Sequence, residues 1–280
     1  MAVVFSICIC NYNMSEHIKE SLTSVLTQLN DDFEVVVIDD GSSDESVRLL
    51  QDLTLKFSNL RVFPYPRDSR RFLGFTRNLS IKHALGEYVV LHIDADDIWD
   101  YGIVDWCEKA RQLSQRMDDN VYIAGKQINM VNKKMLTDFG GYRNIFYTED
   151  RDLWMRLAAH KKILFVYHEL FRTRMKLSSG VKYRKLLKVM WHILLNDLRT
   201  GSSVQAQLMP VLKDSCQSTR TRGFKNAAFR VMIFPIAAVI ALLKGPIHDF
   251  RPALSPSEWK NYKIRNTKNF SEWFAKSEIE

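Results

Sequence analysis

Three aspartates follow an apolar stretch of the chain in close succession. The stretch runs from Val89 to Ile93, and Asp94, Asp96 and Asp97 come directly after it. Side chains two positions apart on an extended backbone point to the same side, so the carboxylates of Asp94 and Asp96 are expected to converge. Adjacent carboxylates repel each other unless a cation lies near them, and oxygen ligands suit Mg²⁺ or Mn²⁺. The pattern predicts a divalent-metal site able to bind a diphosphate. A solvated acidic turn is the alternative.

A second acidic pair, Asp39 and Asp40, ends another apolar run, just before the sequence GSSDES. Helix N-termini often bind phosphate, but here two acids precede the turn and no lysine follows it, so a phosphate-binding loop is not expected. Carboxylates at this place suit hydrogen bonds to the hydroxyl and N–H groups of a ribose and a base edge. Taken alone, the pair is better explained as an acid-rich helix start stabilised by the helix dipole.

A third acidic group occurs in the segment TEDRDLW. Thr148 is expected to cap a helix whose first turn holds Glu149, Asp150 and Asp152, and Asp152 is placed to pair with Arg156 one turn later. The functional interpretation makes one of these carboxylates a general base that deprotonates an acceptor hydroxyl. By itself the segment does not decide between the structural and the functional interpretation.

The elements expected to position these acids alternate between strand and helix. Helices are expected between the strands, the first capped by Ser15, the second by Ser42 or Ser43, and a later one beginning near Trp99. Continuous Val and Ile strands in such an alternation are typical of a mainly parallel α/β sheet covered on both faces. Ligands of these sheets gather at the carboxyl ends of the strands, where the acids lie. The expected strands cover residues 3–10, 33–40, 60–65, 89–93, 120–128 and 163–168.

Composition limits the class of protein. The chain has 280 residues, of which 46% are hydrophobic and 26% charged, enough for one α/β domain with an appendage. Its four cysteines show neither zinc spacing nor a disulfide framework. The N-terminus reads as a strand rather than a signal peptide. We therefore expect a reduced protein that faces the cytosol.

The C-terminal part differs in character, and we expect a catalytic domain over 1–180 and a helical region over 181–280. Lysine and arginine become frequent after Lys161, within a formal net charge of +8. The segment KYRKLLKVMWHILLNDLR predicts a basic amphipathic helix. Val231–Leu243 is apolar throughout, is interrupted by Pro235, and is shorter than the ~20 residues that span a bilayer.

This mixture of basic, apolar and tryptophan residues suits a surface that lies in the membrane interface. We therefore expect peripheral association with the cytoplasmic face of a membrane. The alternative, given equal weight, is that these helices pack on the catalytic domain as an acceptor platform or form a homodimer contact. The tryptophans concerned are Trp191, Trp259 and Trp273.

Four motifs together carry a resemblance. CICNYN, VVVIDDGSSDES, FTRNLSIKHALGEYVVLHIDADD and the later GGY and TEDRDLWMRL occur in an order and spacing similar to family 2 glycosyltransferases. The resemblance covers roughly residues 3 to 180. It implies the GT-A fold, a Rossmann-like mixed and mainly parallel sheet with helices on both faces, here followed by a helical C-terminal extension. It also implies an Mn²⁺ or Mg²⁺ cofactor and a nucleotide-sugar donor, with UDP-sugar as the default.

The resemblance assigns roles to individual residues. Asp94 and Asp96 match the metal-binding DxD motif, with Asp96 as the direct ligand. Asp150 matches the catalytic base, and Glu149 is the second choice. The residues that it places around the nucleotide, its base and its diphosphate are Asn11, Tyr12, Asp39, Asp40, Arg77, Asn78 and Asp94.

The chain departs from the family after the last expected strand. The family often carries Arg-x-His there, whereas this chain reads FRTRMKLSSG and has no histidine at that place. Arg172 and Arg174 can bind diphosphate oxygens but cannot ligate a metal. The rest of the metal shell is therefore left open.

The implied reaction is inverting transfer of a sugar to a hydroxyl acceptor. Asp150 deprotonates the acceptor, and the metal with Arg172 or Arg174 stabilises the departing diphosphate. Such a reaction serves cell-envelope polysaccharide, lipid-linked oligosaccharide or glycoprotein glycan synthesis. Two other classes stay open: an inactive nucleotide-sugar-binding protein and a sugar nucleotidyltransferase, although the latter usually begins with a glycine-rich basic loop that this chain lacks. Nucleic-acid binding explains the basic charge but not the acids, and is not expected.

Overall fold

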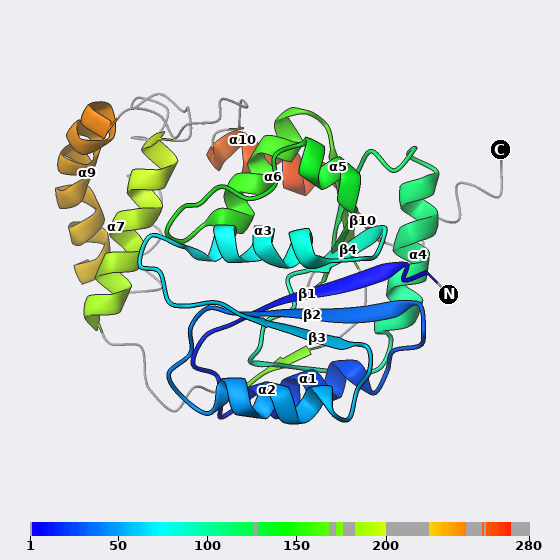
Figure 1. The fold of residues 1–280 in the computed structure, drawn as a ribbon. Helices are drawn as coiled ribbons and strands as arrows, with labels where there is room; N and C mark the ends of the chain where they lie inside the picture. Colours follow the sequence, from blue (N-terminus) through cyan, green and yellow to red (C-terminus); the bar gives the residue numbers. More distant parts are fainter. Residues whose placement is uncertain are drawn as a thin grey trace. The chain divides into compact units, whose positions relative to one another are not determined.

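The computed structural model describes residues 2–125, 128–167, 172–175, 183–199, 224–244, 254 and 256–269. Contacts within the chain divide it into two compact units (Figure 1). The first consists of Met1–Asn144, Lys162–Leu177 and Asn266–Glu280, and the second of Ile145–Lys161 and Ser178–Arg265. A single boundary at residue 180 stays a prediction.

A mixed sheet forms the centre of the first unit. Within the described residues it has eight strands in the order β10-β8-β6-β7-β4-β1-β2-β3. Neighbouring strands are parallel except at β7, which runs antiparallel to β4 and to β6. The predicted mainly parallel sheet is therefore confirmed. The strands are β1 (Phe5–Asn11), β2 (Phe33–Asp39), β3 (Leu60–Pro64), β4 (Tyr88–Leu91), β6 (Tyr122–Ala124), β7 (Asn129–Asn132), β8 (Ile163–Tyr167) and β10 (Thr267–Asn269).

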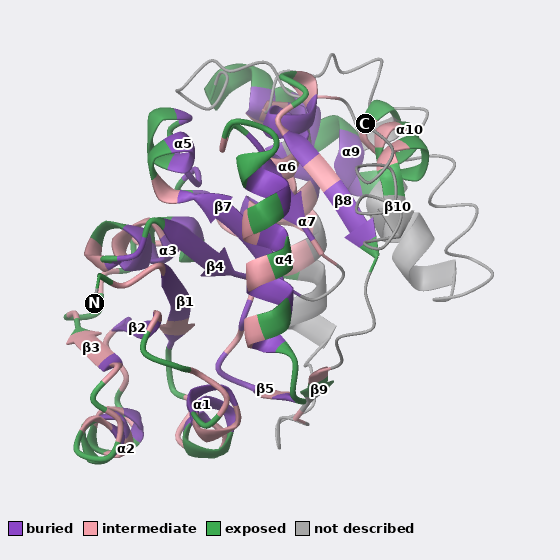
Figure 2. Ribbon diagram, turned by 90° about the vertical axis from the view of Figure 1, so that its right-hand side faces the viewer, coloured by how far each residue is buried: buried purple, intermediate pink, exposed green. Residues whose placement is uncertain are grey.

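Helices cover both faces of this sheet, as Figure 1 shows for α3 on one side and for α1 and α2 on the other. Every residue of β2 is buried, because side chains on both faces of the strand meet a covering layer. Figure 2 shows the central strands β1, β2 and β4 largely buried, the edge strand β3 mostly of intermediate burial, and exposed residues on the outward faces of the helices. The helices of this unit are α1 (Ile18–Leu26), α2 (Ser46–Thr54), α3 (Leu73–His83), α4 (Ile103–Gln115) and α5 (Lys133–Asp138).

The starts of α1 and α2 differ from the prediction. Neither helix has a side-chain hydrogen bond from its cap residue, so the assignment of Ser15, Ser42 or Ser43 as caps is wrong. The serines bind acids of the neighbouring turn instead. The hydroxyl of Ser42 donates to Asp39 at 2.6 Å, and the backbone N–H of Ser15 donates to Asp44 at 2.9 Å. α1 begins only at Ile18 and α2 only at Ser46.

The prediction of a helix beginning near Trp99 is also wrong. Asp97–Trp99 forms a short strand, β5, and α4 begins only at Ile103. β5 pairs antiparallel with β9 (Arg172–Arg174). A strand partner distant in the sequence has therefore overridden the local pattern, which is the usual way that tertiary context defeats a propensity.

The second unit is helical in its described residues. It contains α6 (Glu149–Ala159), α7 (Tyr183–Arg199), α9 (Phe224–Lys244) and α10 (Pro256–Asn266). The apolar side of α7 is buried against α9. The side chains of α7 and α9 that form this core are Leu194, Leu195, Leu198, Ile233, Phe234, Ala237, Ala238 and Ala241.

α9 continues through Pro235, so the predicted interruption of the apolar segment there is wrong. Proline removes one backbone donor, but Phe234 and Ala237 beside it are buried against α7, and such packing supplies most helical stability in proteins. α10 packs on α6 through Trp259 and Trp154, whose stacked rings lie 6.1 Å apart. Among the described helices, none has the length and apolar character needed to cross a membrane.

Candidate functional site

The predicted residues of the first unit gather at one edge of its sheet, where parallel strands end. β1 lies between β2 and β4, so the order of strands reverses at β1. Ligands of open α/β sheets bind outside the carboxyl ends of the strands at such a reversal. Asn11 ends β1, Asp39 ends β2, and Asp94 follows β4, so all three lie at this edge.

Asp39 organises the turn after β2. Its carboxylate accepts hydrogen bonds from the side-chain amide of Asn11 at 2.7 Å, from the hydroxyl of Ser42 at 2.6 Å, and from the backbone N–H of Gly41 at 3.1 Å. The residue is only 1% exposed. Asp39 thus supports the turn from inside. The amide oxygen of Asn11 is buried and has no hydrogen-bond partner within the described residues.

Asp40 points its carboxylate at two arginines that sequence reasoning did not single out. One oxygen accepts a hydrogen bond from Nη1 of Arg67, and the other accepts one from Nε of Arg71. The guanidinium of Arg67 also lies over the ring of Tyr12, 4.5 Å from the ring centroid. Tyr12 is 43% exposed. An aromatic face and a carboxylate therefore stand side by side, both contacted by one arginine.

Gly41 makes this arrangement possible. Its φ angle is +77°, and a Cβ atom there would lie 2.5 Å from the backbone nitrogen of Arg67. Any other residue would be strained and would also collide with the backbone. The close approach places the chain at Arg67 directly beside the turn that carries Asp40.

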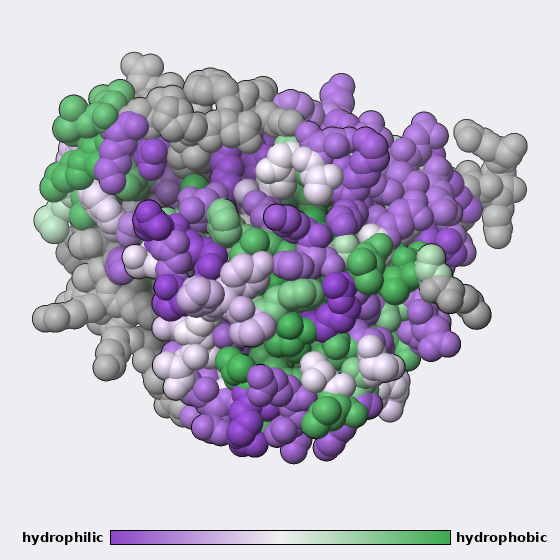
Figure 3. Space-filling view, in the orientation of Figure 1, coloured by the Kyte–Doolittle hydropathy of each residue, from purple (hydrophilic) through white to green (hydrophobic). Residues whose placement is uncertain are grey.

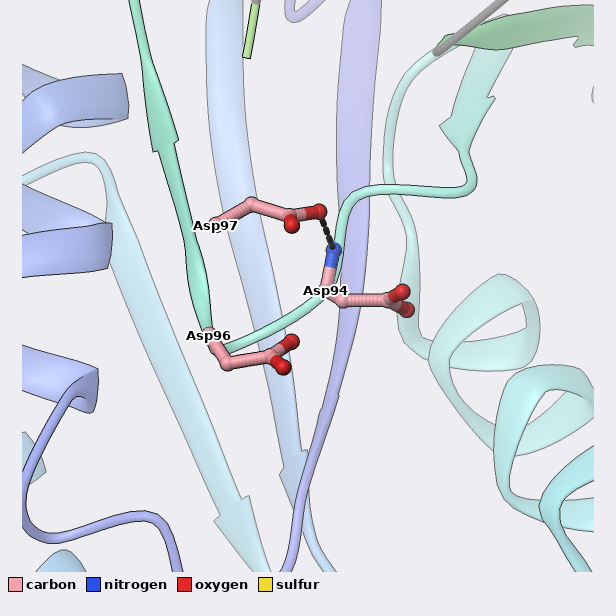
Figure 4. A group of neighbouring side chains, drawn as sticks. All are labelled: Asp94, Asp96 and Asp97. Carbon is pink, nitrogen blue, oxygen red and sulfur yellow. Dashed lines mark hydrogen bonds between the residues drawn. The ribbon is translucent and has the colours of Figure 1, made fainter. Parts of the chain in front are cut away.

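Asp94, Asp96 and Asp97 lie together, with one carboxylate oxygen of each within 4.8 Å of the others (Figure 4). The predicted convergence of Asp94 and Asp96 is confirmed, but the predicted cause is wrong. The segment is a turn between β4 and β5 rather than an extended strand, and it follows His92, whose φ angle is +69°. The turn, not strand alternation, brings the carboxylates together.

Asp97 has a structural part in this group. It is fully buried, and its carboxylate accepts hydrogen bonds from the backbone N–H of Asp94 at 3.4 Å (Figure 4) and from Nη1 of Arg172. Arg172 also donates to the carbonyl oxygen of His92 at 3.3 Å. Asp97 therefore holds the turn, and the carboxylates of Asp94 and Asp96 are the pair suited to a hard divalent cation.

Positive charge flanks Asp94 on two sides. Nη2 of Arg77, which is almost completely buried, lies 3.8 Å from one carboxylate oxygen, and Nη1 of Arg172 lies 4.0 Å from the other. Arg174 stands opposite Asp97 in the β5–β9 pair, and its side chain lies outside the described residues. Two guanidinium groups thus adjoin the acidic turn, and such groups are suited to bind phosphate oxygens.

Asn78 fixes a neighbouring loop. Its amide donates to the carbonyl oxygen of Tyr142 at 2.7 Å and accepts from the backbone N–H of the same residue at 3.0 Å. Gly141 precedes Tyr142 with a φ angle of +60°, and a Cβ atom there would lie 2.6 Å from the amide oxygen of Asn78. The side chain predicted to lie near the nucleotide is therefore engaged with this loop.

The surroundings of His83 favour the neutral form of its imidazole. Burial, followed by the nearby charges of Arg61 and Lys82, lowers the pKa of the imidazole below its ordinary value. Its ring stacks on Phe63 with 3.9 Å between centroids, and Nε2 lies 2.8 Å from the hydroxyl of Tyr65. Burial and the neighbouring cations therefore favour the neutral form of His83.

The acidic pair Glu149 and Asp150 belongs to the second unit, at the start of α6. Thr148 stands at the cap position but makes no side-chain cap bond, so that part of the prediction is wrong. The predicted pair of Asp152 and Arg156 is confirmed, with 2.9 Å between the carboxylate and Nε, and both are buried. The helix start thus has its own internal ion pair.

Asn196 of α7 holds the segment before this pair, and sequence reasoning missed it. Its amide donates to the carbonyl oxygens of Phe146 at 2.8 Å and of Tyr147 at 3.1 Å. Tyr147 and Thr148 both have left-handed backbone angles, with φ of +60° and +66°. A polar residue within the apolar stretch HILLNDLR is the signal that could have revealed it. The C-terminal region therefore shapes the approach to Glu149.

Known proteins resemble this chain in sequence. Residues 6–161 match a family model described as glycosyl transferase family 2. The UDP-Glc:alpha-D-GlcNAc-diphosphoundecaprenol beta-1,3-glucosyltransferase WfgD of Escherichia coli is 28% identical over 145 residues, which cover 51% of this chain and 53% of WfgD. Such matches span about half or less of the length of the curated relatives.

Solved structures share the fold. TarS 1-349 of Staphylococcus aureus in complex with UDP-GlcNAc aligns with a TM-score of 0.55 at 20% identity, covering 86% of this chain and 80% of that one. The mannosyltransferase PcManGT of Pyrobaculum calidifontis in complex with GDP-Man and Mn²⁺ aligns with a TM-score of 0.50 at 16% identity, covering 87% of this chain and 74% of that one.

Proposed function

Because the chain belongs to glycosyltransferase family 2, we propose that it transfers a sugar from a nucleotide diphosphate sugar to a hydroxyl acceptor, with inversion at the anomeric carbon. Its mixed sheet with helices on both faces is the GT-A fold, and the chain is an enzyme of this family. The observation that carries the proposal is the convergence of the Asp94 and Asp96 carboxylates at the end of β4.

The proposed donor is a UDP-sugar. WfgD is named for UDP-Glc, and the TarS structure holds UDP-GlcNAc, which supports a uridine nucleotide here. The exposed ring of Tyr12 and the carboxylate of Asp40 offer a stacking face and a hydrogen-bond acceptor at the end of β1 and β2. A nucleobase can stack on such a ring and donate an N–H group to such a carboxylate. Asn11, with its buried amide oxygen, would border the same pocket.

The proposed cofactor is Mn²⁺ or Mg²⁺, held by Asp94 and Asp96. The donor set fits, because two carboxylates converge while the third, Asp97, is engaged inside the turn. PcManGT was solved with Mn²⁺, which supports divalent-metal use in this fold. When bound, such an ion offsets the charge that develops on the departing diphosphate. Arg77 and Arg172 are proposed to bind its oxygens.

The proposed base is Asp150, with Glu149 as the second choice. Asp150 takes the proton of the acceptor hydroxyl, and the hydroxyl oxygen attacks the anomeric carbon on the face opposite the nucleotide. The bond from that carbon to the diphosphate oxygen breaks, and its electron pair leaves with the nucleotide. Arginine charge beside Asp94 stabilises that leaving group.

The proposed acceptor is lipid-linked or a cell-envelope glycan. The name of WfgD specifies a GlcNAc-diphosphoundecaprenol acceptor, which supports this class. α9 offers a matching surface. It carries an exposed apolar face, visible in Figure 3 over the place of α9 in Figure 1, and no acidic residue. The side chains of this face are Met232, Ile236, Val239, Leu242 and Leu243.

We propose that this α9 face lies in the interface of an anionic membrane, at its cytoplasmic side. An exposed apolar helix face with a lysine nearby is suited to that position. Lys244, which ends α9, is exposed. The apolar side of α7, by contrast, is occupied by α9. A helix–helix contact between two copies of the chain is the competing use of the same face.

The decisive experiment measures sugar transfer and nucleotide binding in the same preparation. The full chain is screened with nucleotide sugars, with and without Mn²⁺, by thermal stabilisation and by release of UDP. Asp150→Asn should lose transfer but keep nucleotide-sugar affinity, because it removes only the proton acceptor. Asp105→Asn, which changes an exposed acid of α4, is the matched control.

Two results would contradict the proposal. Full transfer by Asp150→Asn and by a Glu149→Gln variant would refute the assignment of the base. Nucleotide-sugar binding without transfer or hydrolysis, for every donor and lipid-linked acceptor tried, would indicate a binding protein instead.

A further inference from the structure

Arg67 covers the surface on which a nucleobase would bind. Its guanidinium lies 4.5 Å from the centroid of the Tyr12 ring and donates to one carboxylate oxygen of Asp40. Both groups that suit a base, an aromatic face and an acceptor, are therefore contacted by the same side chain. A base that stacks on this face of Tyr12 must take the volume that the guanidinium now fills.

The two arginines that contact Asp40 are not equivalent. The side chain of Arg71 is only 9% exposed, donates to the carbonyl oxygen of Pro66 as well, and lies over the ring of Tyr65. The side chain of Arg67 is 46% exposed. Arg71 is therefore enclosed by protein on several sides, whereas Arg67 can rotate into solvent without leaving a cavity.

The backbone of Arg67 is fixed while its side chain is not. The close approach of Gly41 holds the chain at Arg67 against the turn after Asp40. The Cα atom is thus a pivot beside the pocket, and only the side-chain torsions need to change for the guanidinium to leave. Asp40 would keep its hydrogen bond from Arg71 throughout.

We propose that Arg67 sets the affinity for the nucleotide by competing with its base. The base displaces the guanidinium from Tyr12, stacks on the ring, and donates an N–H group, such as the imide N–H of uracil, to the Asp40 oxygen that Arg67 releases. This inference rests on the proposed nucleotide-sugar donor and adds a specific affinity-determining residue to it.

The size of the effect follows from the contacts that are lost. A cation–π contact and an ion pair at a partly exposed position are each weak, so displacing Arg67 should weaken base binding by about three- to tenfold. Removing the guanidinium should recover that factor. The gain in affinity comes from the contacts of the base, so it should be measurable for uridine as well as for UDP.

The test compares dissociation constants for UDP and for uridine among wild type, Arg67→Met and Arg70→Met, using calorimetry for UDP and NMR titration for uridine. Arg70 is the matched control, because it lies in the same loop, is 89% exposed at its side chain, and pairs only with Asp68 among the described ion pairs. The control removes the same charge from the same loop. Arg67→Gln serves as a second variant if the methionine variant folds poorly.

We expect Arg67→Met to bind uridine about three- to tenfold more tightly than wild type does, and Arg70→Met to bind it as wild type does. Unchanged or weaker uridine binding by both Arg67 variants overturns the proposal. If these variants bind UDP more weakly but bind uridine as wild type does, Arg67 contacts the diphosphate instead. If UDP binds wild type but no variant differs, only the role of Arg67 fails. If neither ligand binds any of the proteins, the uridine-nucleotide donor fails with it.

Discussion

The guanidinium of Arg172 donates a hydrogen bond to the fully buried carboxylate of Asp97. The same carboxylate accepts from the backbone N–H of Asp94. One buried acid therefore ties β9 to the turn on which the proposed metal ligands stand, and the remaining two carboxylates are left in place to converge. The order of the turn depends on a residue that does not itself need to touch a ligand.

Asp97→Asn should disturb the turn rather than the chemistry. The amide keeps the shape of the side chain but loses the charge opposite Arg172, so we expect a loss of about 1–3 kcal/mol in the free energy of unfolding. The affinity for Mn²⁺ should fall with it. Urea unfolding and Mn²⁺ titration measure both. Asp100→Asn, an exposed neighbour, is the control and should match wild type.

Asp94→Asn and Asp96→Asn should separate ligand binding from folding. Each variant removes a proposed metal ligand. Asp96→Asn also relieves repulsion within the acidic turn, so the metal-free variant should unfold at a temperature no lower than wild type. Asp94→Asn also removes the ion-pair partner of the buried Arg77, so this variant should unfold at a lower temperature. The rise in Tm on adding Mn²⁺ and the sugar-transfer rate should both disappear. Thermal unfolding with and without Mn²⁺ measures this. Retention of the Mn²⁺-dependent rise in both variants would place the metal elsewhere.

Asn196→Leu should affect the proposed base without touching the donor site. The carbonyl oxygens of Phe146 and Tyr147 lose their donor, which should cost about 1–3 kcal/mol of unfolding free energy. Because the segment leads into Asp150, kcat should fall while the affinity for UDP stays the same. Asn261→Leu on the exposed side of α10 is the control. A fall in UDP affinity equal to the fall in kcat would contradict this division of roles.

Stability should depend on pH through His83. Burial and neighbouring cations lower the pKa of His83 in the folded protein, below the ordinary value of 6.5. The unfolded chain then binds a proton more readily than the folded one does, so the stabilisation is complete above the unfolded pKa and is lost as pH falls through the folded pKa. Unfolding free energies between about pH 8 and pH 5 should therefore fall more for wild type than for His83→Gln. Parallel pH profiles would refute this.

The outer face of α9 should bind anionic membranes. Ile236→Asp and Val239→Asp place charge in the middle of the exposed apolar face, so flotation with vesicles of anionic lipid should fall strongly while transfer to a soluble acceptor is retained. Asn261→Asp on α10 changes the charge by the same amount at an exposed position outside that face and is the control. Unchanged flotation, together with a switch from dimer to monomer in light scattering, would assign the face to a contact between two copies.

Local patterns in the sequence determined the framework of the protein. The apolar runs predicted β1, β2, β4 and β8, and the helical periodicity predicted α1, α3 and α7, because burial on one face or two imposes a period that is readable over about ten residues. The carboxyl-end position of Asp39 and Asp94 followed from the same patterns, since an acid cannot remain inside a hydrophobic strand without a partner. The fold class and the place of the proposed site therefore follow from the sequence alone.

Tertiary structure alone decided which groups meet. Asp97 finds Arg172 across 75 residues, Asp40 finds Arg67 across 27, and Asn196 finds Phe146 across 50. No periodicity encodes such pairings, because each depends on where two separately formed segments pack and on how a turn is shaped. The unexpected strand β5 has the same origin, since its pairing with the distant strand β9 outcompeted the local helical pattern. Sequence placed the acids at the sheet edge, and packing determined which groups they contact.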